Sequence, residues 1–135
     1  MPMTDIEQLM ARYPQFEYQF KHSMPDGLKG LTINDKIIIS ADLSDCEKLQ
    51  WLYEEIGHAL TSAGDITDYH AGSNCQQEKR ARKWGMEHHI PYKEIMKYKK
   101  DSYETDYDIA NDLGVQIDYL HTVGFMYGLK YKSVD

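Results

Sequence analysis

Glu54, Glu55 and His58 have the residue types and the spacing that metal-assisted hydrolysis requires. Glu54 and His58 stand four residues apart within an apolar-periodic run that predicts a helix. Both side chains should therefore lie on one helix face, about one turn apart, and reach a single ion. Glu55 should point about a quarter-circle away, where its carboxylate could hold a water molecule on that ion without ligating the ion. These residues predict a metal site with an adjacent general base.

Zinc peptidases with the pattern H-E-x-x-H use the same arrangement, in which the third ligand comes from elsewhere in the chain. In this chain Glu54 replaces the first His of that pattern, and we identify Glu78 as the third candidate ligand. The candidate metal set is therefore Glu54, His58 and Glu78, with Glu55 as the base. Each residue also has a plainer interpretation: a solvated helical Glu, a packed or surface His, and a Glu78 that pairs with its basic neighbours.

A Glu at the first ligand position changes the charge of the site. A His-His-Glu set on Zn²⁺ leaves a net charge of about +1, whereas Glu54, His58 and Glu78 leave about zero, so the ion acidifies its water less. A carboxylate-rich set also accepts Mn²⁺ or Fe²⁺. His70, in the loop before Glu78, is an alternative ligand that would restore two-His ligation. Loops also often carry histidines with no such function.

The residues before this site predict one helix and three strands that must position it. A Thr-x-x-Glu capping box predicts a helix from Thr4 to about Arg12. Apolar alternation and turn residues predict strands at 16–21, 28–33 and 36–40, and their closeness in sequence predicts an antiparallel sheet. A second capping box begins the site helix, which we expect to run from Ser44 to about Ser62.

The second half of the chain predicts helices only, so the fold class is α+β. After a loop over residues 62–74, we expect helices from Asn74 to about His88, Pro91 to about Lys99, Thr105 to Leu113, and Gln116 to about Lys130. Gly57 inside the site helix costs about 1 kcal/mol relative to Ala, which predicts the close approach of another backbone.

Composition excludes several classes of function. The formal net charge of -7 and the pI near 5.3 argue against nonspecific binding to nucleic acid or to an anionic membrane. No stretch approaches the roughly 18 apolar residues of a membrane span, and the first residues do not resemble a signal peptide. We therefore expect a cytoplasmic protein whose two cysteines are reduced thiols.

The segments Leu52–Thr61 (LYEEIGHALT) and Gln77–Trp84 (QEKRARKW) resemble the ImmA/IrrE family of zincin-like metallopeptidases, in the short form found on Gram-positive prophages and mobile elements. The resemblance implies a zincin-like core with an N-terminal helix, a three-stranded antiparallel sheet, an active-site helix and further helices. It also implies a zinc cofactor and a cytoplasmic location. By this resemblance, His58 and Glu78 match metal-ligand positions and Glu55 matches the catalytic Glu, while Glu54 stands at the first His.

Characterised members of the family relieve repression by cleaving or binding a helix-turn-helix repressor. The resemblance therefore implies a metal-dependent, site-specific endopeptidase that acts as an antirepressor. The alternative is a non-catalytic protein that sequesters the repressor. A substrate would bind extended along the edge of the sheet beside Lys36–Ser40, unless that isoleucine run is an interior strand.

We place the metallopeptidase core in residues 1–100 and a helical, helix-turn-helix-like extension, packed on the core, in residues 101–135. Its packing residues would be Ala110, Gly114, Val115 and Leu120. Residues 101–135 contain seven acidic residues and only two Lys, so this segment would repel the phosphates of DNA. The extension is therefore expected to support the core or to dock a protein partner rather than to bind DNA.

Overall fold

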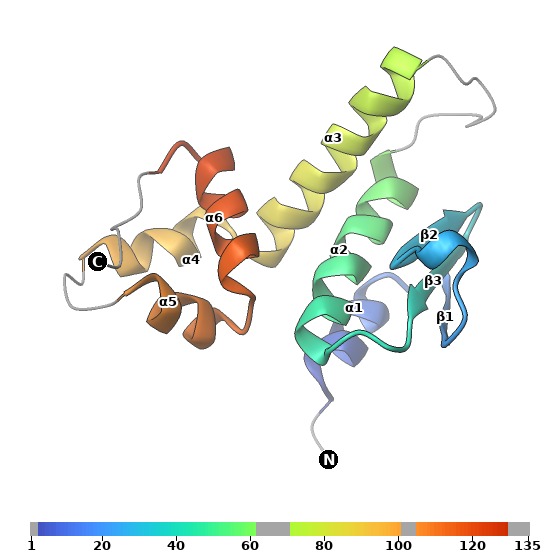
Figure 1. Cartoon of the computed structure of the whole chain (residues 1–135), viewed down its shortest axis with the longest axis horizontal. Coiled ribbons are helices and arrows are strands. Elements are labelled where there is room, and N and C mark those ends of the chain that lie inside the picture. The colour runs from blue at the N-terminus through green and yellow to red at the C-terminus, as the bar shows by residue number, and fades with distance from the viewer. Residues whose placement is uncertain (1–2, 62–70, 101–104, 130–135) are drawn as a thin grey trace. The chain divides into compact units, whose positions relative to one another are not determined.

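The computed structural model describes residues 3–61, 71–100 and 105–129 (Figure 1). These residues confirm the α+β class, with helices before and after one small sheet. The elements are α1 (Asp5–Arg12), β1 (Glu17–Lys21), η1 (Pro25–Gly27), β2 (Gly30–Ile33), β3 (Lys36–Ser40), α2 (Asp45–Thr61), α3 (Ala71–His89), α4 (Tyr92–Met96), η2 (Lys97–Lys100), α5 (Asp106–Leu113) and α6 (Ile117–Met126). Among the described residues, no helix is long and apolar enough to span a membrane.

The chain forms two compact units, Met1–Gly85 and Met86–Asp135. Residues 86–100 therefore group with the C-terminal helices rather than with the sheet. The division into a core of residues 1–100 and an extension of residues 101–135 stays a prediction.

The sheet has the strand order β1-β3-β2, with β3 in the centre. β2 pairs antiparallel with β3 across a two-residue turn, but β1 pairs parallel with β3. The expectation of an all-antiparallel sheet is therefore wrong for β1. Only β2 and β3 are joined by a tight turn, which forces antiparallel pairing, whereas the longer connection through η1 lets β2 pass to the far side of β3. Ile37, Ile38 and Ile39 are all buried, as in a central strand.

α1 and α2 cover the sheet through one shared core. Their starts are confirmed: Thr4 and Glu7 form a capping box, and Ser44 Oγ accepts a hydrogen bond from the backbone N–H of Glu47. On α2, Leu52 and Ile56 are fully buried, as expected of the apolar-periodic run that predicted this helix. The core of this unit consists of Leu9, Ile37, Ile39, Leu52, Tyr53 and Ile56.

α3 begins at Ala71, so the expectation of a loop through residue 74 and of a cap at Asn74 is wrong. An Asn inside a helix costs only about 0.7 kcal/mol relative to Ala, so its presence does not by itself fix a helix start. Residues 62–70 of the predicted loop lie outside the described part of the chain.

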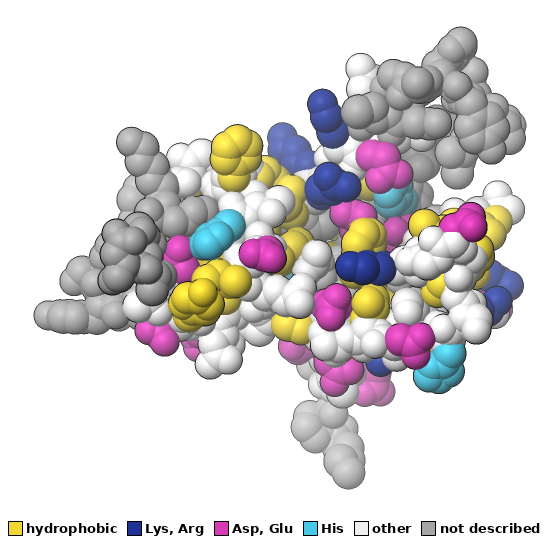
Figure 2. All heavy atoms as spheres, in the orientation of Figure 1, with side chains coloured by type: hydrophobic (Ala, Val, Ile, Leu, Met, Phe, Trp, Pro, Cys, Tyr) yellow, Lys and Arg dark blue, Asp and Glu magenta, His cyan; other side chains and the backbone are white. Residues whose placement is uncertain are grey.

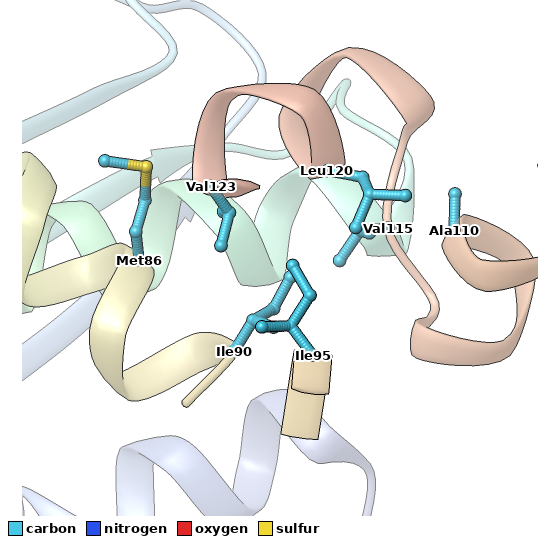
Figure 3. Close-up of a cluster of buried hydrophobic side chains, with 7 residues drawn as sticks. All are labelled: Met86, Ile90, Ile95, Ala110, Val115, Leu120 and Val123. Atoms are coloured by element: carbon cyan, nitrogen blue, oxygen red, sulfur yellow. The ribbon is translucent and has the colours of Figure 1, made fainter. Parts of the chain in front are cut away.

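The C-terminal unit has its own core, built from the end of α3, α4, α5 and α6 (Figure 3). It consists of Met86, Ile90, Ile95, Ala110, Val115, Leu120 and Val123. Gly114 ends α5 in the left-handed conformation, with φ of 70°. The predicted packing of Ala110, Val115 and Leu120 is therefore confirmed, and Val123, which the sequence analysis did not single out, joins them.

Candidate functional site

Glu54, His58 and Glu78 converge at one place in the first unit. Glu54 and His58 lie one turn apart on α2, and Glu78 reaches them from α3. One ligand atom from each residue lies within 4.8 Å of the other two, and His58 Nε2 lies 3.3 Å from Glu78 Oε2. Glu54 and His58 are half-buried, while Glu78 is exposed. The structure thus brings together the three residues predicted as ligands, and their function as ligands stays a prediction.

Two glycines allow α2 and α3 to approach closely enough for this convergence. A Cβ atom at Gly57 would lie 2.5 Å from the backbone oxygen of Ala81, and one at Gly85 would lie 3.1 Å from the backbone nitrogen of Glu54. Both distances are below van der Waals contact, so the two backbones touch where side chains would normally separate them. The close approach expected from Gly57 is confirmed, and it occurs beside both candidate ligands on α2.

The donor set fits a divalent cation. Two carboxylates and one imidazole are ligand types that Zn²⁺ accepts, and the excess of oxygen donors also suits Mn²⁺. Ligand atoms at about 2.0–2.2 Å from a tetrahedral ion are about 3.4 Å apart. His58 and Glu78 already have that separation. The remaining distances require side-chain movements of about an ångström, which the exposed carboxylate of Glu78 permits.

Glu55 lies beside this set but is held separately. Its side chain is buried, at 5% exposure, and its Oε1 accepts a hydrogen bond of 2.7 Å from Thr32 Oγ1 on β2. A Cβ atom at Gly30 would lie 2.8 Å from Glu55 Cγ, so only a glycine leaves room for this carboxyl group. The sequence allowed Glu55 to be placed beside the candidate ligands, but it did not reveal the contacts of Glu55 with Thr32 and Gly30. A glycine inside a strand, two residues from a threonine on the same face, was the available signal.

The surroundings of Glu55 suit a group that exchanges protons. Burial raises the pKa of Glu55, while the hydrogen bond from Thr32 and the charge of His58 lower it, and the neighbouring Glu54 and Glu78 raise it. The direction of the shift is upward, toward the pH range in which a carboxyl group can both accept and release a proton.

A cleft of about 480 Å³ opens over these residues. Its lining comprises Leu28, Gly30, Leu31, Thr32, Trp51, Glu54, Glu55, His58, Gln77, Glu78 and Arg82. β2 contributes one wall, and β3 is its one strand partner in the described sheet, so the other edge of β2 is not paired with a described strand. The expectation that Lys36–Ser40 forms the substrate-binding edge is wrong, because β3 is paired on both sides. The alternative, an interior strand, is confirmed.

Two further predicted or missed residues complete the description of the site. His70, the alternative ligand, lies outside the described residues. Arg82, which lies four residues after Glu78 on α3, directs its Nε to Glu54 Oε1 at 3.3 Å. Spacing alone could place Arg82 on the same helix face as Glu78, but the pairing depends on how α3 lies against α2.

Comparison with known proteins agrees with the geometry. None of the curated proteins and none of the solved structures gives a significant match. A family model described as the IrrE N-terminal-like domain, Peptidase M78, matches residues 4–121, which include every residue of the candidate site. The chain therefore belongs to the IrrE N-terminal-like family of M78 peptidases, a zinc-dependent peptidase type.

Proposed function

We propose that this protein is a metal-dependent endopeptidase that cleaves a helix-turn-helix repressor of a prophage or mobile element. The observation that carries the proposal is the convergence of Glu54, His58 and Glu78 beside a buried Glu55, at one cleft. Membership of a peptidase family supports the reaction class. The choice of a repressor as substrate rests on the resemblance of the Glu54–His58 segment to antirepressor peptidases.

Glu54, His58 and Glu78 would hold Zn²⁺, or Mn²⁺ in its place. A bound divalent cation supplies Lewis acidity, which polarises the scissile carbonyl and lowers the pKa of a water molecule. Glu55 takes one proton from the water whose oxygen attacks the carbonyl carbon, and delivers it to the amine nitrogen as the C–N bond breaks. Thr32 holds Oε1 of Glu55, so Oε2, on the side of Gly30, is the atom that carries the proton.

The open edge of β2 supports an extended substrate. A peptide that adds a strand beside Gly30–Ile33 would use backbone hydrogen bonds for affinity and alternate side chains for specificity. Leu28, Leu31 and Trp51 make part of the cleft apolar, so apolar substrate side chains would be accommodated there. Because this mode of binding reads a segment of backbone rather than a chain terminus, it suits an endopeptidase.

A second candidate function is sequestration of the repressor without cleavage. The observation that favours it is the ion pair between Arg82 and Glu54, which occupies an oxygen of a candidate ligand. In this case the cleft would bind the repressor, and derepression would not depend on Glu55.

The test is to incubate the purified protein, with Zn²⁺ or Mn²⁺, with the repressor encoded nearest to its gene, and to follow intact masses. The enzyme account predicts two fragments whose summed mass exceeds the mass of the intact repressor by one water. Cleavage should be abolished in Glu55→Gln and in His58→Ala, and retained in the matched control Asp45→Asn, whose side chain is 94% exposed. Derepression in cells that survives both Glu55→Gln and His58→Ala would instead support sequestration.

A further inference from the structure

Arg82 joins the two helices of the site through one of the candidate ligands. It lies four residues after Glu78 on α3, and its Nε is 3.3 Å from Oε1 of Glu54 on α2. The Glu54 side chain is 16% exposed and the Arg82 side chain is 55% exposed, so the pair lies at the mouth of the cleft. Figure 2 shows basic side chains along α3 with acidic and histidine side chains beside them.

The charge of the cleft gives this pair a specific consequence. Three carboxyl groups line it, those of Glu54, Glu55 and Glu78, and Arg82 is the one Lys or Arg among its described lining residues. With all three carboxyl groups ionised, a divalent cation alone leaves the site with a charge of about -1. Arg82 brings the total to about zero.

A carboxylate has two oxygen atoms, and each can bind a different partner. Arg82 occupies Oε1 of Glu54, which leaves Oε2 as the oxygen available to a cation. A carboxylate that is paired with a guanidinium donates less electron density to a metal, and its second oxygen cannot add to the coordination. The pairing therefore favours ligation through a single oxygen and a cation that keeps more of its positive charge.

We propose that Arg82 is a positioning residue that stays paired with Glu54 when the cation binds, weakening cation binding and preserving the acidity of the bound ion. This inference rests on the metal site of the proposed function. It predicts that metal affinity and hydrolysis rate change in opposite directions: loss of Arg82 should tighten metal binding and slow peptide hydrolysis. If the contact were merely structural, its loss would weaken metal binding and slow hydrolysis together, since partners that orient a ligand typically strengthen metal binding.

The deciding experiment measures Zn²⁺ affinity of the full chain by competition with a chromophoric chelator, at fixed pH and ionic strength. Arg82→Gln should bind Zn²⁺ roughly three- to tenfold more tightly than the wild type, because a positive charge near the ion is removed. Arg82→Lys, which keeps the charge, should stay within about twofold. Arg80→Gln, an exposed position on α3 that does not line the cleft, should also stay within about twofold and controls for net charge.

Turnover of the repressor provides the second measurement, and Arg82→Gln should lower kcat by roughly tenfold. Weaker Zn²⁺ binding in Arg82→Gln, or a change equal to that of Arg80→Gln, would overturn the inference and leave the metal site intact. An unchanged kcat with tighter binding would overturn the claim about acidity. A wild-type protein that binds no Zn²⁺ would overturn both this inference and the proposed function.

Discussion

Thr32 on the edge strand β2 donates a hydrogen bond of 2.7 Å from its Oγ1 to Oε1 of Glu55 on α2. The same hydroxyl lies 3.2 Å from the backbone oxygen of Glu55. The edge strand that borders the cleft is therefore tied to the candidate general base, and the position of one depends on that of the other.

Thr32→Val should impair catalysis through the protonation of Glu55. The hydrogen bond from Thr32 lowers the pKa of Glu55, so its loss raises that pKa further. If Glu55 acts as an ionised base, the acid limb of the pH profile of kcat/KM should move to higher pH. Stability should fall by about 1 kcal/mol. Thr32→Ser keeps the hydroxyl and should keep the wild-type profile, so identical profiles for Val, Ser and wild type would contradict the prediction.

Gly57→Ala should destabilise the protein and separate the candidate ligands. Ala normally stabilises a helix interior by about 1 kcal/mol relative to Gly. Here the added Cβ would lie 2.5 Å from a backbone oxygen of α3, which cannot move as a flexible side chain can. We expect a net loss of about 1–3 kcal/mol in urea unfolding, together with weaker Zn²⁺ binding. A stabilised variant would show that the two helices do not pack as described.

Gly30→Ala should affect catalysis more than stability. Its Cβ would meet Cγ of Glu55 at 2.8 Å and Oε2 at 3.0 Å, so the carboxyl group must turn away from its present position. We expect a loss of kcat of about tenfold or more, as for other displacements of catalytic groups by about an ångström. Phe20→Ala, on β1 and outside the residues that line the cleft, is the control and should retain activity, because Phe20 is 38% exposed. Equal rates for the two variants would contradict this placement of Glu55.

His89 in the C-terminal unit should make stability depend on pH. Burial lowers the pKa of His89 to about 4, below its ordinary value of 6.5. Between these two pH values His89 therefore binds more protons in the unfolded chain than in the folded protein. The free energy of unfolding is highest above pH 6.5 and falls as the pH falls toward 4. The slope should be at most about 1.4 kcal/mol per pH unit. Urea midpoints at pH 7 and pH 5 measure it.

His89→Gln should flatten that dependence, because it removes the group whose pKa is lowered by burial. His89 Nδ1 lies 3.2 Å from the Tyr119 hydroxyl, so Gln is chosen to keep a polar partner for Tyr119. An unchanged pH dependence in His89→Gln would assign the effect to other groups.

Local chemistry allowed much of the fold to be predicted from the sequence. The capping boxes at Thr4 and Ser44 correctly located two helix starts, because a cap is a contact between neighbours in sequence, and the expected start at Thr105 is likewise a capped helix start in the structure. α5 ends at Leu113 as expected, and Gly114 follows it in the left-handed conformation. The parallel pairing of β1 was not predicted, because strand order depends on where a connection passes in three dimensions.

In the candidate site, too, some features could be predicted from the sequence and others could not. Glu54 and His58 could be paired from helical periodicity alone, and Glu78 was added from the following helix. Thr32, Gly30 and the pairing of Arg82 with Glu54 depend on contacts between elements far apart in sequence, which periodicity does not reveal. The chemistry of the site was therefore easier to predict than the contacts that tune it.

The central claim is that one divalent cation binds between α2 and α3 through Glu54, His58 and Glu78. Isothermal titration of metal-free protein with Zn²⁺, compared with His58→Ala, Glu78→Gln and the control Asp45→Asn, tests it most directly. The account predicts one ion per chain for the wild type and the control, and affinity at least tenfold weaker in both ligand variants. No binding by the wild type, or equal affinity in all four proteins, would contradict it.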